Sequence, residues 1–171
     1  MLITLTGFMG SGKTTVGEVL ADFLGCPFYD LDALVVKKAG RSIPEIFADG
    51  GEAAFRTLEA KVLRQAVEKY AESTAILSLG GGTLGTPASA RLVAEKTTCI
   101  YLRASVDTLA ARLAPEAACR PLLRGAPDLR ERIAALLAGR EDVYASIAHV
   151  TVDTDGLSPE QIADEIVISC L

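Results

Sequence analysis

The chain has little of the chemistry that metal-binding and disulfide-rich proteins need. It contains one histidine, His149, and four cysteines that lie far apart with no CxxC pair. A zinc site needs several well-spaced Cys or His ligands, and disulfide frameworks belong to short secreted chains. We therefore expect free thiols in a reducing cytosol. His149 lies in the apolar stretch IAHVTV, so we expect a structural role for it rather than a place in a Cys–His nucleophile pair.

Excess positive charge and long apolar runs are also absent. Lys and Arg number 17 against 22 Asp and Glu, which gives a net charge of -5 and a pI near 4.9. An acidic chain is a poor partner for nucleic-acid phosphates. No apolar run approaches the roughly 18 residues of a membrane helix, and the N-terminus shows no signal-peptide core. We expect a cytoplasmic protein with no nucleic-acid or membrane partner, and a monomer because its exposed helices carry mixed charge.

The order of predicted elements is that of an α/β protein. Short apolar runs predict strands at residues 2–6, 27–32, 74–79, 97–103 and 149–153. Helices are predicted at residues 13–24, in short pieces between 32 and 49, and from about 51 to 71. Continuous apolar strands that alternate with helices indicate a parallel sheet covered on both faces. The length of 171 residues favours one domain, so we expect a single doubly wound domain over residues 1–171.

Residues 7–14 carry the most specific motif. They read GFMGSGKT, which fits GxxxxGK[ST] in full between a predicted strand and a predicted helix. Glycines let the backbone N–H groups turn toward phosphate oxygens, and the helix N-terminus adds a positive dipole end. Lys13 then supplies charge for the β- and γ-phosphates, and the Thr14 hydroxyl is a ligand for Mg2+. We predict nucleoside triphosphate binding by Gly10, Ser11, Gly12, Lys13, Thr14 and Thr15.

The chain contains no asparagine, and this narrows the class of nucleotide-binding protein. A GTP-driven switch normally reads guanine with an Asn-Lys-x-Asp segment, which cannot occur here. The chain is also too short for a motor or for a ring-forming ATPase module with its extra helical part. The favoured class is a small ATP-dependent kinase.

Two carboxylates, Asp30 and Asp32, end the second predicted strand. Positions i and i+2 of a strand share one face, so both carboxylates are expected in the crevice where ligands gather in open parallel sheets. One would be linked to Mg2+ and the other would lie near an acceptor hydroxyl. The alternative is a helix N-cap, which Asp32 would form, beside a solvated acid.

Three further features have a plain and a functional interpretation. Arg56 either pairs with Glu59 at i+3 or presents its guanidinium fork to a substrate carboxylate. Gly80–Gly82 closes the third strand, and a triple glycine is costly unless the backbone must approach something closely. Arg140 lies near a helix end, where a solvated cation is the usual case.

Residues 113–128 break the strand–helix pattern. They combine three prolines and a glycine with Arg120 and Arg124, over a length that is unusual for a connection. The segment is either a disordered loop or a lid that closes on an anion.

Taken together, these motifs resemble those of shikimate kinases. The phosphate loop, YDLD, the segment IFADGGEAAFRTLE (46–59), LSLGGG and CRPLL occur in the order seen in that family, over residues 2 to 153. The resemblance implies a P-loop three-layer αβα sandwich with a five-stranded parallel sheet. It also implies a substrate-binding helical insert at about 31–60 and a mobile lid at about 113–128.

The resemblance further implies a reaction and a substrate site. ATP would give its γ-phosphoryl group to the 3-hydroxyl of shikimate in chorismate and aromatic amino acid biosynthesis, with Mg2+ as cofactor. Asp32 resembles the residue that holds the ring hydroxyls and takes the acceptor proton, and Arg56 and Arg140 resemble the fork on the carboxylate. The remaining substrate contacts would come from Phe47, Phe55, Gly80, Gly81 and Gly82.

On the nucleotide side, Arg120 resembles the lid arginine that reaches the phosphates, and Arg112 matches a position that stacks on adenine. Thr14 resembles the direct Mg2+ ligand, and Asp30 and Ser78 its outer partners. Lys13, Mg2+ and Arg120 would supply the charge that phosphoryl transfer needs, and each such contact is typically worth roughly 3–4 kcal/mol of barrier.

Two other functions stay open at this point. A kinase for another polyhydroxy acid, such as gluconate, shares the phosphate loop but should lack the FR, GGG and RPLL set. A non-catalytic nucleotide-binding protein would bind ATP and transfer nothing, and the intact Asp30, Asp32, Lys13 and Thr14 argue against it.

Overall fold

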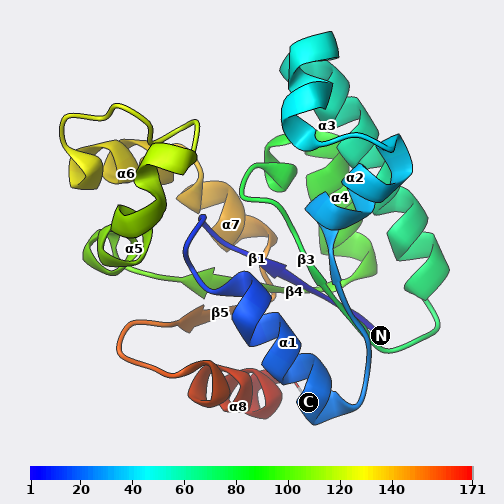
Figure 1. The fold of residues 1–171 in the computed structure, drawn as a ribbon. Helices are drawn as coiled ribbons and strands as arrows, with labels where there is room; N and C mark the ends of the chain where they lie inside the picture. Colours follow the sequence, from blue (N-terminus) through cyan, green and yellow to red (C-terminus); the bar gives the residue numbers. More distant parts are fainter. Residues whose placement is uncertain (171) are drawn as a thin grey trace.

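The computed structural model of the protein describes residues 1–170, and its centre is a parallel sheet (Figure 1). The strands lie in the order β2-β3-β1-β4-β5, and every neighbouring pair is parallel. The five strands are β1 (Leu2–Thr6), β2 (Phe28–Asp30), β3 (Ala75–Ser78), β4 (Thr98–Arg103) and β5 (Val150–Asp153). This arrangement confirms the predicted α/β fold.

Helices cover both faces of the sheet, because successive strand residues point to opposite sides. Ile3 and Leu5 pack with α1 (Lys13–Leu24) and α8 (Pro159–Cys170) in one core. Leu77 and Tyr101 belong to a second core on the other face. The helices of that side are α2 (Leu31–Ala39), α3 (Ile43–Tyr70), α4 (Pro87–Lys96), α5 (Val106–Leu113), α6 (Leu129–Ala138) and α7 (Glu141–Ile147). The result is the predicted three-layer sandwich.

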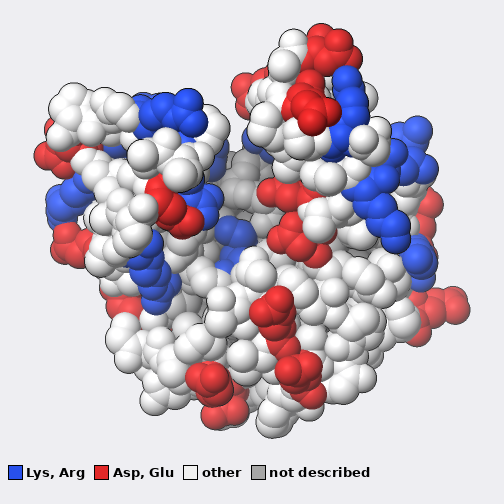
Figure 2. Space-filling view, in the orientation of Figure 1, with Lys and Arg blue, Asp and Glu red and all other residues white. Residues whose placement is uncertain are grey.

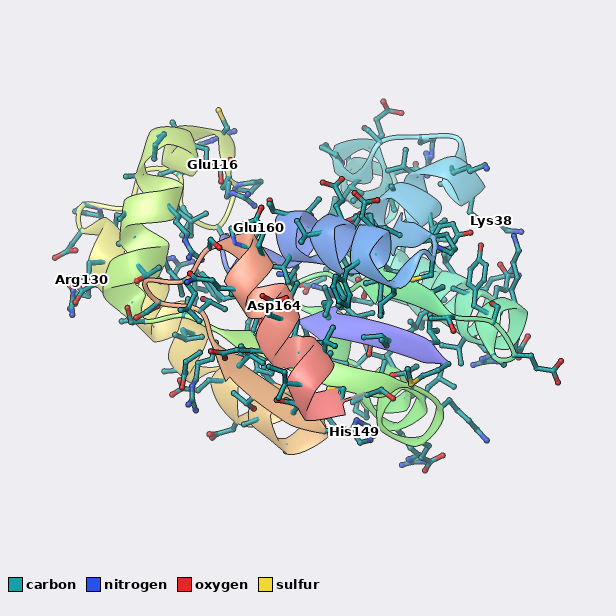
Figure 3. All side chains as sticks on the ribbon, turned by 90° about the horizontal axis from the view of Figure 1, so that it is seen from below. Lys38, Glu116, Arg130, His149, Glu160 and Asp164 are labelled. Atoms are coloured by element: carbon teal, nitrogen blue, oxygen red, sulfur yellow. The ribbon has the colours of Figure 1, made fainter. Side chains whose placement is uncertain are left out.

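Figure 3 shows the α8 side of this sandwich, where α8 lies beside α1 and carries Glu160 and Asp164 on its exposed surface. Among residues 1–170, no helix is long and apolar enough to cross a membrane.

The second strand is shorter than the sequence predicts. It ends at Asp30, and α2 (Leu31–Ala39) begins at the next residue. The Asp30 carboxylate accepts a hydrogen bond from the Ala33 N–H at 3.0 Å and so caps α2. The placement of Asp32 on the strand is therefore wrong, as is its assignment as the cap, because Asp32 lies in the first turn of the helix.

The long helix agrees with the predicted boundary near residue 51. It runs from Ile43 to Tyr70 but is interrupted at Gly51, whose φ of 72° lies outside the helical region. Between α5 and α6, residues Ala114–Cys119 form a short 3₁₀ helix that is followed by turns. This part of the chain lies opposite α2 and α3 across the carboxyl ends of the strands (Figure 1).

His149 has the structural role that the sequence predicts. Its imidazole Nδ1 accepts a hydrogen bond from the Cys99 backbone N–H at 3.0 Å, and its backbone N–H donates to the Cys99 carbonyl at 2.8 Å. Burial raises the pKa of the Cys99 thiol to about 11. The two hydrogen bonds between His149 and Cys99 therefore join the start of β5 to β4. The Cys99 thiol stays protonated at neutral pH and is not a reactive nucleophile.

Candidate active site

The loop between β1 and α1 has the backbone of a phosphate cradle. Gly7, Gly10 and Gly12 have φ values of 152°, 78° and 93°, in the left-handed region that favours glycine. A Cβ on Gly7 would lie 2.7 Å from the Leu102 carbonyl oxygen, and one on Gly10 would lie 2.9 Å from Cγ of Leu113. The loop ends at the N-terminus of α1, where the orphan N–H groups favour an anion.

Lys13 lies over this loop. Its ammonium donates to the Gly7 carbonyl at 2.7 Å and to the Phe8 carbonyl at 3.1 Å. Burial of the ammonium lowers the pKa of Lys13 to about 8, although the carboxylates of Asp32 and Asp30 oppose this and the arginine charges reinforce it. A bound polyphosphate would add negative charge beside the ammonium and favour its charged form.

The first turn of α1 offers hydroxyl groups to a cation and to phosphates. Thr14 and Thr15 are exposed there, whereas Ser11 is buried and its Oγ has no hydrogen-bond partner within residues 1–170. On the neighbouring strands Asp30 lies opposite Ser78. Within the same residues no group of three or more His, Cys, Asp or Glu side chains forms a metal cage. Mg2+ usually takes one or two protein oxygens together with substrate phosphates, so Thr14 and Asp30 fit it.

Among the acids, Asp32 has the largest electrostatic effect on Lys13, because its charge raises the lysine pKa more than that of Asp30 does. Burial raises the pKa of Asp32 itself, and the charges of Asp30 and Glu59 add to this while Lys13 opposes it. A Cβ on Gly80 would lie 3.3 Å from Oδ1 of Asp32. The structure thus brings Asp32 between the phosphate cradle and the glycine turn, although by a helix rather than by the predicted strand.

The Gly80–Gly82 turn leaves room for two guanidinium groups. A Cβ on Gly82 would overlap Nη2 of Arg56, and one on Gly81 would lie 3.2 Å from Nη1 of Arg140. The close approach that the triple glycine predicts is therefore made within this structure by two arginines, which come from α3 and from the residue before α7.

Arg56 forms the ion pair with Glu59 that the three-residue spacing predicts. Its Nη1 lies 2.9 Å from Oε1 of Glu59, and its Nε lies 3.7 Å from the exposed Glu52. Glu59 is 1% exposed, and its second oxygen accepts a hydrogen bond from the Thr83 hydroxyl at 3.0 Å. The buried Glu59 thus holds Arg56 against the glycine turn, and the Thr83 bond is a contact that the sequence does not reveal.

Arg56, Arg140, Gly81, Gly82 and Tyr144 line one cavity of about 340 Å³. Beside it the rings of Phe47 and Phe55 pack at 5.0 Å between centroids, and the Arg56 guanidinium lies 5.1 Å from the Phe55 ring. Figure 2 shows the cleft between the lobe of residues 113–128 and the lobe of α2 and α3, with cationic side chains on its floor and one wall. Two guanidinium groups in one cavity favour an anionic ligand.

The two arginines predicted for the nucleotide also lie near the cradle. Nη2 of Arg120 lies 2.9 Å from Glu116, and its charge contributes to the lowered pKa of Lys13. Arg112 donates from Nη1 to the Gly10 carbonyl at 3.2 Å. The structure therefore brings Arg120 near Lys13 and places Arg112 directly on the phosphate loop, whereas the Glu116 contact is not evident from the sequence.

The site combines a phosphate cradle, a partly buried acid whose charge acts on the cradle lysine, and a neighbouring cavity lined by two guanidinium groups, and this combination defines a class. The class is that of small P-loop kinases that phosphorylate an anionic hydroxy compound. The shikimate kinase family model matches residues 9–170. The chain is 45% identical over 161 residues to the shikimate kinase of Chlorobium chlorochromatii, over 90% of this chain and 82% of that one. The chain belongs to the shikimate kinase family.

Solved structures of the family have the same fold. Shikimate kinase from Acinetobacter baumannii in complex with shikimate matches with a TM-score of 0.87 and 32% identity, over 97% of this chain and 90% of that chain. Shikimate kinase from Bacteroides thetaiotaomicron matches with a TM-score of 0.86 and 30% identity, over 99% of this chain and 96% of that chain. The similarity therefore extends over the whole sandwich and both lobes of the cleft.

Replacing Gly82 tests whether the absence of a side chain at this position is what leaves room for the Arg56 guanidinium. In Gly82→Ala the new methyl group would displace the Arg56 guanidinium, while the Gly82 φ of -109° is open to alanine. We expect the KM for the acidic substrate to rise by about 10- to 100-fold, the range for a charged hydrogen bond, with little loss of stability. The KM for ATP is the internal control and should stay unchanged, because the methyl group is added next to Arg56. An unchanged KM for the acidic substrate, or an equal rise in both KM values, would contradict the prediction.

Proposed function

We propose that the protein is a shikimate kinase, which transfers the γ-phosphoryl group of ATP to the 3-hydroxyl of shikimate and releases shikimate 3-phosphate and ADP. The observation that carries this proposal is the convergence of Arg56 and Arg140 on the glycine turn, which Asp32 also approaches, with the Asp32 charge acting on Lys13. The named function of the relatives, one of them solved with shikimate, supports the same substrate. We also propose that the reaction takes place in the cytoplasm.

In the proposed reaction the chain's own residues bind and align the two reactants. Arg56 and Arg140 would hold the shikimate carboxylate, and Phe47 and Phe55 would pack against its ring. Asp32 would then accept the proton of the attacking hydroxyl. Holding the hydroxyl in line with the γ-phosphate supplies much of the rate enhancement, since phosphoryl transfer needs alignment and charge stabilisation more than covalent help.

The developing charge on the phosphates would be met by Lys13 and Arg120. Lys13 is already fixed over the cradle by its two carbonyl contacts. Arg120 would exchange its contact with Glu116 for the phosphates. Mg2+, held through Thr14 with Asp30 and Ser78 close by, would neutralise part of the phosphate charge when bound.

The domain organisation that fits this function is one kinase domain, with residues 31–60 as the substrate-binding insert and residues 113–128 as a lid. Leu113, at the start of the lid, packs on Gly10 of the phosphate loop, which supports coupling between the nucleotide and the lid. We propose that the lid closes on bound ATP and excludes water that would otherwise hydrolyse it. An ATPase rate without acceptor that equals the kinase rate would contradict lid closure.

ADP release with Mg2+ and ATP tests the function, with shikimate, gluconate or no acceptor added. We expect strong stimulation by shikimate alone, because the cavity offers two guanidinium groups to a carboxylate and the Phe47–Phe55 pair lies next to Arg56 for a cyclic ring. Stimulation by gluconate would show that the acceptor cavity serves an open-chain acid. Nucleotide binding without stimulation by either acid would favour a binding protein instead.

A further inference from the structure

Tyr144 is a buried side chain that the reaction described above does not use. It is 1% exposed, and its ring packs against Tyr101 at 5.2 Å between centroids. Its hydroxyl donates a hydrogen bond to the carbonyl oxygen of Gly81. Tyr144 follows Arg140 by four residues, so α7 places both of them against the glycine turn.

This hydrogen bond fixes more than one atom. The Gly81 carbonyl and the Gly82 N–H belong to one rigid trans peptide unit, in which they point in opposite directions. Fixing the carbonyl therefore fixes the direction of the Gly82 N–H. Among the hydrogen bonds formed within residues 1–170, none is donated by the N–H of Gly81 or Gly82. Both glycines line the cavity that Arg56 and Arg140 share.

The glycine turn needs such a restraint. Consecutive glycines adopt many backbone conformations, so an unrestrained peptide between them turns over at little cost. The flanking contacts act on other atoms of the turn: the Thr83 N–H donates to the Gly80 carbonyl at 3.2 Å, and the Thr83 hydroxyl donates to Glu59. Tyr144 alone bonds to the carbonyl of the Gly81–Gly82 peptide in the hydrogen bonds of the described chain.

We propose that Tyr144 is a positioning residue for the acidic acceptor: its hydroxyl holds the Gly81–Gly82 peptide so that the Gly82 N–H is presented to the ligand beside Arg56 and Arg140. The inference rests on the proposed function. Burial raises the pKa of Tyr144, so the hydroxyl stays protonated and able to donate at neutral pH. The same helix aims Arg140 at this turn, so α7 would set two contacts to one ligand.

Tyr144→Phe removes only the hydroxyl and keeps the packing of the ring. We expect the KM for shikimate to rise about tenfold, the effect of one lost hydrogen bond, with the KM for ATP and kcat each within about twofold of the wild type. Tyr101→Phe is the matched control. It makes the same chemical change in the other ring of the pair, and Tyr101 does not line the cavity.

The amide NMR signals of Gly81 and Gly82 report on the turn without any substrate. We expect them to shift or broaden in Tyr144→Phe and to stay in place in Tyr101→Phe. An unchanged KM for shikimate, or an equal rise in both variants, would overturn the inference. Failure of the wild type to phosphorylate shikimate would overturn the proposed function instead. In that event, unchanged glycine signals in Tyr144→Phe would overturn the positioning role as well.

Discussion

Lys13→Met is expected to lower kcat by about 10²–10³-fold while the fold persists. The Gly7 and Phe8 carbonyls hold the ammonium over the phosphate cradle, where the proposed reaction uses its charge to stabilise the transferred phosphoryl group. A methionine fills the same space and supplies no charge. Steady-state ADP release at saturating shikimate and ATP measures the loss. Lys38→Met is the matched control, because Lys38 is exposed on α2 and points away from the sheet (Figure 3).

The same substitution should stabilise the protein. The pKa of Lys13 falls from 10.5 to about 8, mainly through burial, so its charged form costs up to about 3 kcal/mol at neutral pH. Part of this gain is offset because the two loop carbonyls lose their donor. We expect a net gain of about 1 kcal/mol, or about 2–4 °C in Tm. Lys13→Met would then be much less active and more stable than the wild type, as is common when a functional group is removed.

The pH dependence separates this cause from better packing. Between pH 8 and 10.5 the unfolded chain binds more protons at Lys13 than the folded chain does, so the wild type gains stability as the pH rises. The Tm advantage of Lys13→Met should therefore shrink over this window. A constant advantage from pH 7 to 10.5 would indicate packing, and a lower Tm at pH 7 would contradict the prediction outright.

Asp32→Asn is the second large effect that we expect, with kcat about 10²–10⁴-fold lower and the KM for ATP little changed. In the proposed reaction the Asp32 carboxylate, near the glycine turn and acting on Lys13, accepts the hydroxyl proton, and an amide cannot do so. Rates measured with shikimate and ATP varied independently give both constants. Asp22→Asn, at an exposed position of α1, should leave the rate unchanged. A loss confined to the KM for shikimate would assign Asp32 to binding only.

The pH profile of the wild type should carry the signature of Asp32. Burial raises the pKa of this carboxyl above its ordinary value of 3.8, so the acid limb of kcat/KM should lie at a higher pH than for an exposed aspartate. The residual activity of Asp32→Asn should lack this limb. A raised pKa also means that the folded chain binds the proton more tightly, so stability is lost as the pH rises through the folded-state pKa. Asp32→Asn should accordingly be more stable than the wild type at pH 7.

Local patterns predicted the sheet and the phosphate loop well because both depend on neighbouring residues. The strand at residues 2–6 and the helix at 13–24 have the bounds that their apolar periodicity and flanking glycines indicate. Asp30 and Asp32 show where such patterns fail. The side chain of Asp30 starts a helix one residue after the strand, so the two-residue spacing no longer places both acids on one strand face.

Contacts that join distant segments were not predictable from the sequence. The bond from Tyr144 to Gly81 spans 63 residues, and that from Thr83 to Glu59 spans 24. Neither pair has a spacing signal, because the sheet topology rather than the local chain brings them together. The Arg56–Glu59 pair, at three residues apart on one helix, could be predicted for the opposite reason.

The glycine turn also determines how easily this site can change by mutation. Where a protein binds its ligand through side chains, a point substitution can remove or replace one contact at a time. Here the turn presents backbone without side chains: a Cβ added at Gly82 would overlap Arg56, and one added at Gly81 would lie 3.2 Å from Arg140. If the proposed site is correct, an inhibitor anchored on these backbone groups would leave the protein few routes to resistance, because a substitution that blocks the inhibitor would also press on the arginines proposed to hold the substrate.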